Sequence, residues 1–301
     1  MMRTRRRAVR RVARSVLALA LVVTLGIATV AQSNGTEESD VAFTFGPDVS
    51  EAERAFIRTA IDEAQAFFAS RFGHRAGEFD VFAFAAPDRV ADAYVEFLDI
   101  QGETDYIYER WRGGTIGEAT HGAFFLLVGD VWRNRWDDGR RYELLAHESF
   151  HVVQHELSGP DAPRSSRYEV PSSGPYWLRE GSAVYAQLRA ADARGYGDYA
   201  DQRRERVRAV RDHLRDHDLD LSNLEVFPGF EEVGPHVAYS ASFLAAEYLA
   251  QRHGDASLLD FSAGVREWLT WQNSFRQTFG QTVEAFYEAF AAYQQEQFGP
   301  E

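Results

Sequence analysis

The segment Tyr142–Leu157, YELLAHESFHVVQHEL, constrains this chain most, because it reads as one helix with two histidines four residues apart. Residues at that spacing lie on the same face of a helix, one turn above each other. His147 and His151 can therefore direct two imidazole nitrogens at a single zinc ion. Glu148 lies beside that position without being a ligand, where it can accept a proton from a zinc-activated water. The pattern H-E-x-x-H thus predicts a metal helix with its own base.

A third metal ligand has to come from elsewhere in the chain. His155 continues the same helix face, but it lies about 12 Å from His147 along the axis, too far for two ligand bonds of about 2 Å. We interpret His155 as a residue outside the ligand set that supports the site or lines the cleft, or as a solvated polar position. Glu180, in the stretch YWLREGSAVYAQ, is the better candidate. The tryptophan and leucine shortly before it predict burial, and the small residues after it let two helices approach closely.

The two stretches together resemble a known family. HESFH followed by WLREGSA is similar to the gluzincin zinc metallopeptidases, and most closely to the peptidase-MA-like family, in which H-E-x-x-H is followed by W-x-x-E-G-x-A. The resemblance covers His121 to Gly254. It implies hydrolysis of peptide bonds, with a peptide or a protein as substrate.

The resemblance also implies a role for each motif residue. His147, His151 and Glu180 would bind one zinc ion per chain, and Glu148 would be the general base. Thermolysin-like gluzincins place an aspartate four residues after the glutamate ligand, where it orients a histidine. This sequence has Val184 there, so the motif does not identify the residues that orient the zinc histidines.

A further catalytic residue is expected after the metal helices. Gluzincins commonly supply a tyrosine or histidine that donates a hydrogen bond to the oxyanion formed during hydrolysis. The stretch GPHVAY contains both, as His236 and Tyr239. We expect Tyr239, because a phenol stays a neutral donor at pH 7 whereas a histidine is partly charged. The alternative is that Tyr239 only caps or packs its helix.

The N-terminal segment, residues 1–31, has the pattern of a signal peptide or a membrane anchor. Seven arginines lie in the first fourteen residues, and an uncharged apolar run, Val16–Ala31, follows them. The run is shorter than the roughly 20 residues that span a bilayer, which favours a cleaved signal. Either form predicts export, with the remainder secreted or attached to the outer face of a bacterial cytoplasmic membrane. The polar residues 32–40 are expected to form a linker.

The charge balance excludes some partners. Without the seven arginines of residues 1–31, the formal charge of −14 becomes −21. Such a surface repels nucleic acid and anionic lipid, so we expect no nucleic-acid partner, and membrane contact only through an uncleaved N-terminal segment. The chain has no cysteine, so an exported domain would depend on its apolar core rather than on disulfides.

The order of apolar patterns predicts an α+β fold. A peptidase domain, 41–298, would consist of a small N-terminal α/β sheet subdomain, 41–133, packed on a mainly helical, zincin-like subdomain, 134–298, that carries the metal helix. The third strand could be an edge strand that binds the substrate backbone or a central strand. The expected strands are 41–45, 79–85 and 122–128, and the expected helices are 51–72, 88–98, 138–158, 176–187, 198–218, 239–253, 258–269 and 282–297.

These patterns favour an exported zinc metallopeptidase. Two alternatives remain: a catalytically inactive, gluzincin-like binding module, and a membrane-anchored interaction protein. The intact Glu148 disfavours the binding module, because a structural zinc site needs no base and closes its fourth position with protein.

Overall fold

A small sheet forms the N-terminal part of the computed structural model, which describes residues 41–159 and 168–299. Its strands lie in the order β1-β2-β4-β3. The first three are parallel, and β3 is an antiparallel strand at the edge. The expected signal segment, 1–31, and linker, 32–40, lie outside the described residues. The strands are β1 (Val41–Phe45), β2 (Phe79–Phe84), β3 (Gly117–Thr120) and β4 (Ala123–Leu127).

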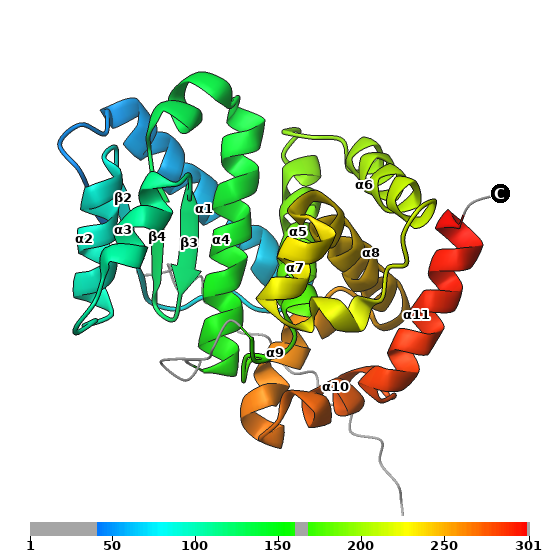
Figure 1. The fold of residues 1–301 in the computed structure, drawn as a ribbon. Helices are drawn as coiled ribbons and strands as arrows, with labels where there is room; N and C mark the ends of the chain where they lie inside the picture. The colour runs from blue at the N-terminus through cyan, green and yellow to red at the C-terminus, as the bar shows by residue number, and fades with distance from the viewer. Residues whose placement is uncertain (1–40, 160–167, 300–301) are drawn as a thin grey trace, which may run out of the picture. The chain divides into compact units, whose positions relative to one another are not determined.

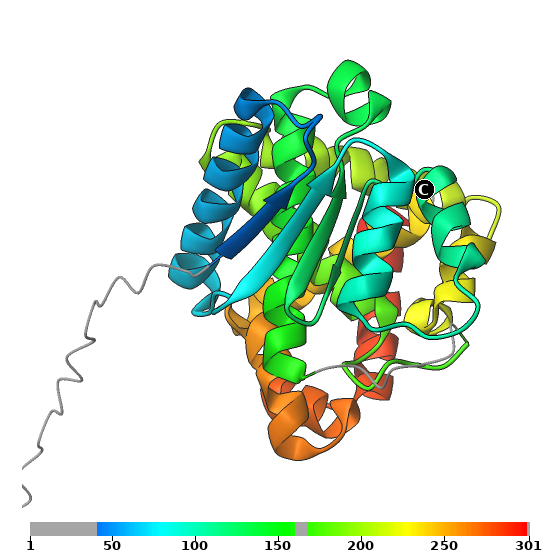
Figure 2. The same cartoon turned by 90° about the vertical axis from the view of Figure 1, so that its left-hand side faces the viewer.

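Helices cover both faces of this sheet, with α1 and α4 on one face and α2 and α3 on the other (Figure 2). Alternate side chains of a strand point to opposite faces. In β4, Phe124 therefore packs with the α1 and α4 side, whereas Phe125 packs with the α2 and α3 side. The helices are α1 (Glu51–Phe72), α2 (Pro87–Phe97), α3 (Asp105–Arg112) and α4 (Asp138–Ser158).

The first helix has the ends that its sequence predicts. Ser50 and Glu53 form the capping box, with each side chain bonded to the other's backbone nitrogen, and Gly73 ends the helix at a φ of 77°. Phe68 and Phe72 then pack edge-on against Phe150 of α4, at 5.2 Å between ring centroids in each case. This contact holds α4 against the sheet layer.

The predicted metal helix, α4, lies between the sheet and the other helices (Figure 1). It contacts α1, β3 and β4 on one side and α5 and α9 on the other. Asp137 caps its start by accepting a hydrogen bond from the backbone nitrogen of Arg140 at 2.8 Å, and Gly159 follows its last residue. Both predicted boundaries are confirmed, and residues around most of its circumference are buried.

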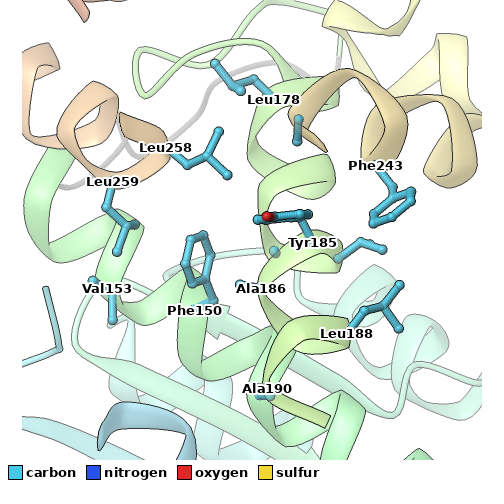
Figure 3. Packing of buried hydrophobic residues seen from close by; sticks show 14 of the residues in the cluster. Phe150, Val153, Leu178, Tyr185, Ala186, Leu188, Ala190, Phe243, Leu258 and Leu259 are labelled. Carbon is cyan, nitrogen blue, oxygen red and sulfur yellow. The ribbon is translucent and has the colours of Figure 1, made fainter. Parts of the chain in front are cut away.

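The C-terminal part of the described chain is helical. Figure 3 shows its core beside α4, where Phe150 and Val153 meet Tyr185 of α5 and Leu258 and Leu259 of α9. The helices are α5 (Tyr176–Ala193), α6 (Tyr199–Leu214), α7 (Phe227–Val233), α8 (Pro235–His253), α9 (Ser257–Trp268), α10 (Trp271–Phe279) and α11 (Val283–Phe298).

Several details differ from the sequence prediction. The third expected strand, β4, is central, so the edge position belongs to β3, which the apolar pattern missed. Helix α8 begins at Pro235 rather than at Tyr239, because proline suits a first helical position, so Tyr239 lies inside the helix. Helix α6 ends at Leu214, four residues before the expected end. The short helices α3, α7 and α10 were not predicted.

The described residues belong to one compact unit of mixed α+β structure, which confirms the predicted class. The helices within residues 41–159 and 168–299 include none with both the length and the apolar content to cross a bilayer.

Candidate metal centre

The structure brings together the three residues predicted as metal ligands. His147 and His151 come from α4, and Glu180 comes from the second turn of α5. Nε2 of His151 lies 3.0 Å from Nε2 of His147 and 3.2 Å from Oε2 of Glu180. The remaining pair, Nε2 of His147 and Oε2 of Glu180, is 3.4 Å apart. Among the described residues, this is the one cluster of three histidine or acidic side chains with metal-ligand spacing.

The spacing of these three atoms fits a tetrahedral ion. Zinc bonds of about 2.0–2.1 Å in a tetrahedron place neighbouring ligand atoms about 3.3 Å apart. The observed separations of 3.0–3.4 Å match that value. His147, His151 and Glu180 can therefore hold a metal ion, and two imidazoles with one carboxylate form a donor set that suits zinc.

Two glutamines fix the orientation of the histidines. Nδ1 of His147 lies 2.7 Å from Oε1 of Gln187, and Nδ1 of His151 lies 2.7 Å from Oε1 of Gln154. An amide oxygen accepts, so Nδ1 of each ring carries a proton, and Nε2 is the nitrogen that can give up its proton to bind a metal. Gln154 is held in turn, because its Nε2 donates to Oγ of Ser182 at 2.8 Å. These glutamines are the orienting residues that the motif did not identify.

The position of Glu180 depends on close packing of α5. Gly181 lies against α8 so tightly that a Cβ there would collide with the carbonyl oxygen of Ser242. The expectation that a small residue permits this approach is confirmed. Burial raises the pKa of the Glu180 carboxyl, but the charge of His151, hydrogen bonds from both histidines and the charge of Arg179 together hold that pKa well below its usual range. Glu180 is therefore ionised, as a metal ligand must be.

Glu148 lies between the histidines and the edge of the sheet. A Cβ on Gly117 of β3 would be 3.1 Å from Cγ of Glu148, so the glycine makes room for this side chain. Burial raises the pKa of Glu148, and the charge of Glu180 adds to that rise, against the lowering effect of His147, His151 and a backbone hydrogen bond from Ala119. A carboxyl whose pKa is raised toward neutral is a better general base than an ordinary glutamate.

The metal cluster opens into a cleft of about 740 Å³. The N-terminal half of α4, the C-terminal half of α5, helix α6 and the first turn of α8 line this cleft, and His147 and Glu148 lie on its wall. This site has a base and an open cleft, so it has room for a substrate. A closed structural zinc site has no such room.

Both candidate oxyanion donors line the same cleft. Tyr239 is half-buried, and its ring packs against Phe230 at 5.3 Å between centroids, whereas His236 is exposed. The charge of Glu180, then burial and the charge of Glu148, raise the pKa of Tyr239 well above its usual value. The phenol is therefore protonated near neutral pH and can donate a hydrogen bond.

His155 is not part of the cluster. It is half-buried and lines a separate small cavity with Gln154 and Arg179, on the far side of the ligands. This placement agrees with the prediction that it cannot share an ion with His147.

Comparison with known proteins adds no family assignment. A scan against protein-family models found no match, and a search of curated proteins found no similar sequence. The site itself therefore carries the functional inference.

Proposed function

We propose that this protein is a zinc-dependent metallopeptidase, in which His147, His151 and Glu180 hold one zinc ion and Glu148 is the general base. The observation that carries this proposal is the convergence of three ligand atoms at 3.0–3.4 Å beside a buried carboxyl at the wall of an open cleft. When bound, zinc supplies Lewis-acid chemistry, which lowers the pKa of water to about 7 and polarises a carbonyl oxygen.

The side chains around the site support a division of roles. Glu148 takes a proton from the attacking water and returns it to the leaving amine, for which its raised pKa is suited. Tyr239 donates a hydrogen bond from its phenolic hydroxyl to the oxyanion that develops on the substrate carbonyl. Gln154 and Gln187 hold the imidazoles in the tautomer that binds metal.

The edge strand β3 is a candidate support for the substrate backbone. Among the described strands it pairs only with β4, which leaves its other side unpaired, and its residues Gly117 and Ala119 lie beside Glu148. An extended peptide can add to such an edge by main-chain hydrogen bonds. This role was one of the two alternatives for residues 122–128, and we now propose it for β3, because β4 is central.

We also propose a subdomain architecture and a cellular location for this protein. We regard residues 134–298 as a zincin-like helical subdomain packed on the sheet subdomain. The apolar segment of residues 1–31 supports export of the chain. The expected partner is a peptide or protein substrate, and the charge of −14, which is −21 without residues 1–31, argues against nucleic acid.

Metal analysis with a peptide digest tests the proposal. The purified full-length chain should contain one zinc per molecule and cleave members of a mixed peptide library, detected by mass spectrometry. A chelator should remove both zinc and cleavage, and added zinc should restore them. The inactive-module alternative predicts no cleavage, with or without zinc, and absence of bound metal would contradict the peptidase.

A further inference from the structure

The α6 side of the cleft carries a cation with unusual surroundings. Arg206 lines the cleft from α6, together with Gln202 and Glu205 of the same helix. Its guanidinium lies over the ring of Phe243 in α8, 5.4 Å from the centroid, which stabilises a cation modestly. Its Nε is buried and has no hydrogen-bond partner.

The pairing of Arg206 differs from that of a neighbouring arginine in the same helix. Arg203, one turn earlier in α6, donates from Nε to both carboxylate oxygens of Glu247 at 2.8 Å. Arg206 has no comparable ion pair or hydrogen bond with any residue in ranges 41–159 and 168–299. Burial of a guanidinium nitrogen without an acceptor is costly, so the unpaired Nε of Arg206 calls for an explanation.

The acids near Arg206 are engaged elsewhere or point away. Glu143 of α4 is the negative charge that acts on it most strongly, but Oε2 of Glu143 accepts from Arg140 at 2.9 Å and Oε1 accepts from Gln202 at 3.2 Å. Glu205 is the adjacent residue on the helix and is exposed, and adjacent helical residues do not face each other. The cation therefore retains its capacity to bind an anion from outside.

Two neighbours of Arg206 belong to the helices that carry site residues. Glu143, which acts on it, precedes His147 by four residues, or about 6 Å along α4. Phe243, which lies beneath it, follows Tyr239 by four residues, again about 6 Å along α8. An extended peptide advances about 3.3 Å per residue. Both neighbours of Arg206 thus lie about one helical turn from a site residue, and Arg206 lines the same cleft as His147 and Tyr239, so a short extended peptide bound there can reach it.

We infer that Arg206 is a specificity-determining residue that binds a carboxylate of the substrate within the cleft. A guanidinium is suited to this task, because its planar donors match a carboxylate in two parallel hydrogen bonds. The carboxylate is either the C-terminus of a peptide or the side chain of an acidic residue. The inference rests on the proposed function for the bond that is cleaved, but the binding preference can be measured without cleavage.

Affinity for matched peptides tests this inference. The protein is the full-length, zinc-loaded chain with Glu148→Gln, which keeps the cleft and removes the base. One probe pair is acetylated tetra-alanine with a free C-terminus and the same peptide as an amide. The other is an amidated acetyl-Ala-Ala-Glu-Ala peptide and its glutamine counterpart. Isothermal titration should show about tenfold or greater preference for the carboxylate member of one pair, since a charged hydrogen bond contributes that much.

The variants separate Arg206 from general electrostatics. Arg206→Gln should abolish the preference, so that the carboxylate peptide and its neutral counterpart bind about equally. Arg206→Lys should keep part of the preference, because lysine retains the charge but not the planar guanidinium. Arg208→Gln is the matched control, since Arg208 is an exposed arginine of the same helix outside the cleft lining, and it should leave the preference unchanged. If Arg206→Gln does not fold, the lysine variant and the unsubstituted Arg206 still give the comparison.

Each result of the peptide titrations either supports or contradicts the role of Arg206. Preference in the first pair assigns the terminal carboxylate, and preference in the second assigns an acidic side chain. No preference in either pair, or a preference that survives Arg206→Gln, overturns the inference. A chain that binds these peptides as described but cleaves no peptide with Glu148 restored would refute the proposed function and leave this inference standing.

Discussion

The two ends of the cleft differ in how their polar groups are paired. At the metal end, each histidine has a glutamine on Nδ1, and Glu180 has both histidines within 3.4 Å. At the α6 end, Arg206 lies over an aromatic ring without a hydrogen-bonding partner among the described residues. Groups that perform chemistry need a fixed geometry, whereas a group that selects a ligand must keep its bonding capacity free. The difference separates a reacting end from a recognising end.

Removal of a ligand should give the largest effect at the metal end. His151→Ala should weaken zinc binding by more than about a hundredfold, because loss of even an outer partner of a zinc ligand costs about 10–100-fold. The measurement is zinc affinity by competition with a chromogenic chelator. His155→Ala is the matched control one turn further along α4, and equal losses in both variants would contradict the ligand assignment.

Loss of the oxyanion donor should lower the rate of hydrolysis and leave the zinc content unchanged. Tyr239→Phe keeps the ring that packs on Phe230 but removes the hydroxyl, so kcat should fall about a hundredfold with zinc content unchanged. His236→Ala, in the same cleft, is the comparison. A change below about threefold for Tyr239→Phe, with a large loss for His236→Ala, would move the role to the histidine.

The glutamine partners should have a smaller effect on the metal. Gln187→Ala removes the acceptor on Nδ1 of His147, so zinc affinity should fall about 10–100-fold. Gln202→Ala is the control, because Gln202 lines the same cleft but bonds Glu143 instead of a histidine. Equal zinc affinity of the two variants would show that Gln187 does not position the metal site.

The smallest effect is expected at the recognising end. Glu143→Gln removes the negative charge that acts most strongly on Arg206, so carboxylate peptides should bind about threefold tighter. Stability should change by no more than about 1 kcal/mol, because the Arg140 partner is more than half exposed, at 56%. Weaker binding of the carboxylate peptides in this variant would contradict the view that Glu143 restrains Arg206.

The sequence predicted the reacting end far better than the recognising end. His147, Glu148 and His151 follow from a local helical spacing, and Gly181 beside Glu180 indicated a close helix contact that the collision with Ser242 confirms. Long helices with clear caps, such as 51–72 and 138–158, were also predictable from local signals.

The remaining features depend on contacts between distant segments. Gln187 follows His147 by 40 residues, and no spacing rule connects an amide to a histidine at that separation. Arg206 belongs to α6, and its contact with Phe243 of α8 joins two helices that no local periodicity connects. The edge strand β3 is four residues long with no apolar alternation, so its pairing with β4 was not visible from periodicity.

The most direct test of the central claim compares the unmodified chain with Glu148→Gln, in zinc content and in peptide hydrolysis. The substitution keeps the size of the buried side chain at the wall of the cleft but removes its basicity. We predict that zinc remains at one per chain while hydrolysis falls by about 10²–10⁴-fold. Hydrolysis at an unchanged rate would contradict Glu148 as the base, and loss of zinc would show that Glu148 is a ligand instead.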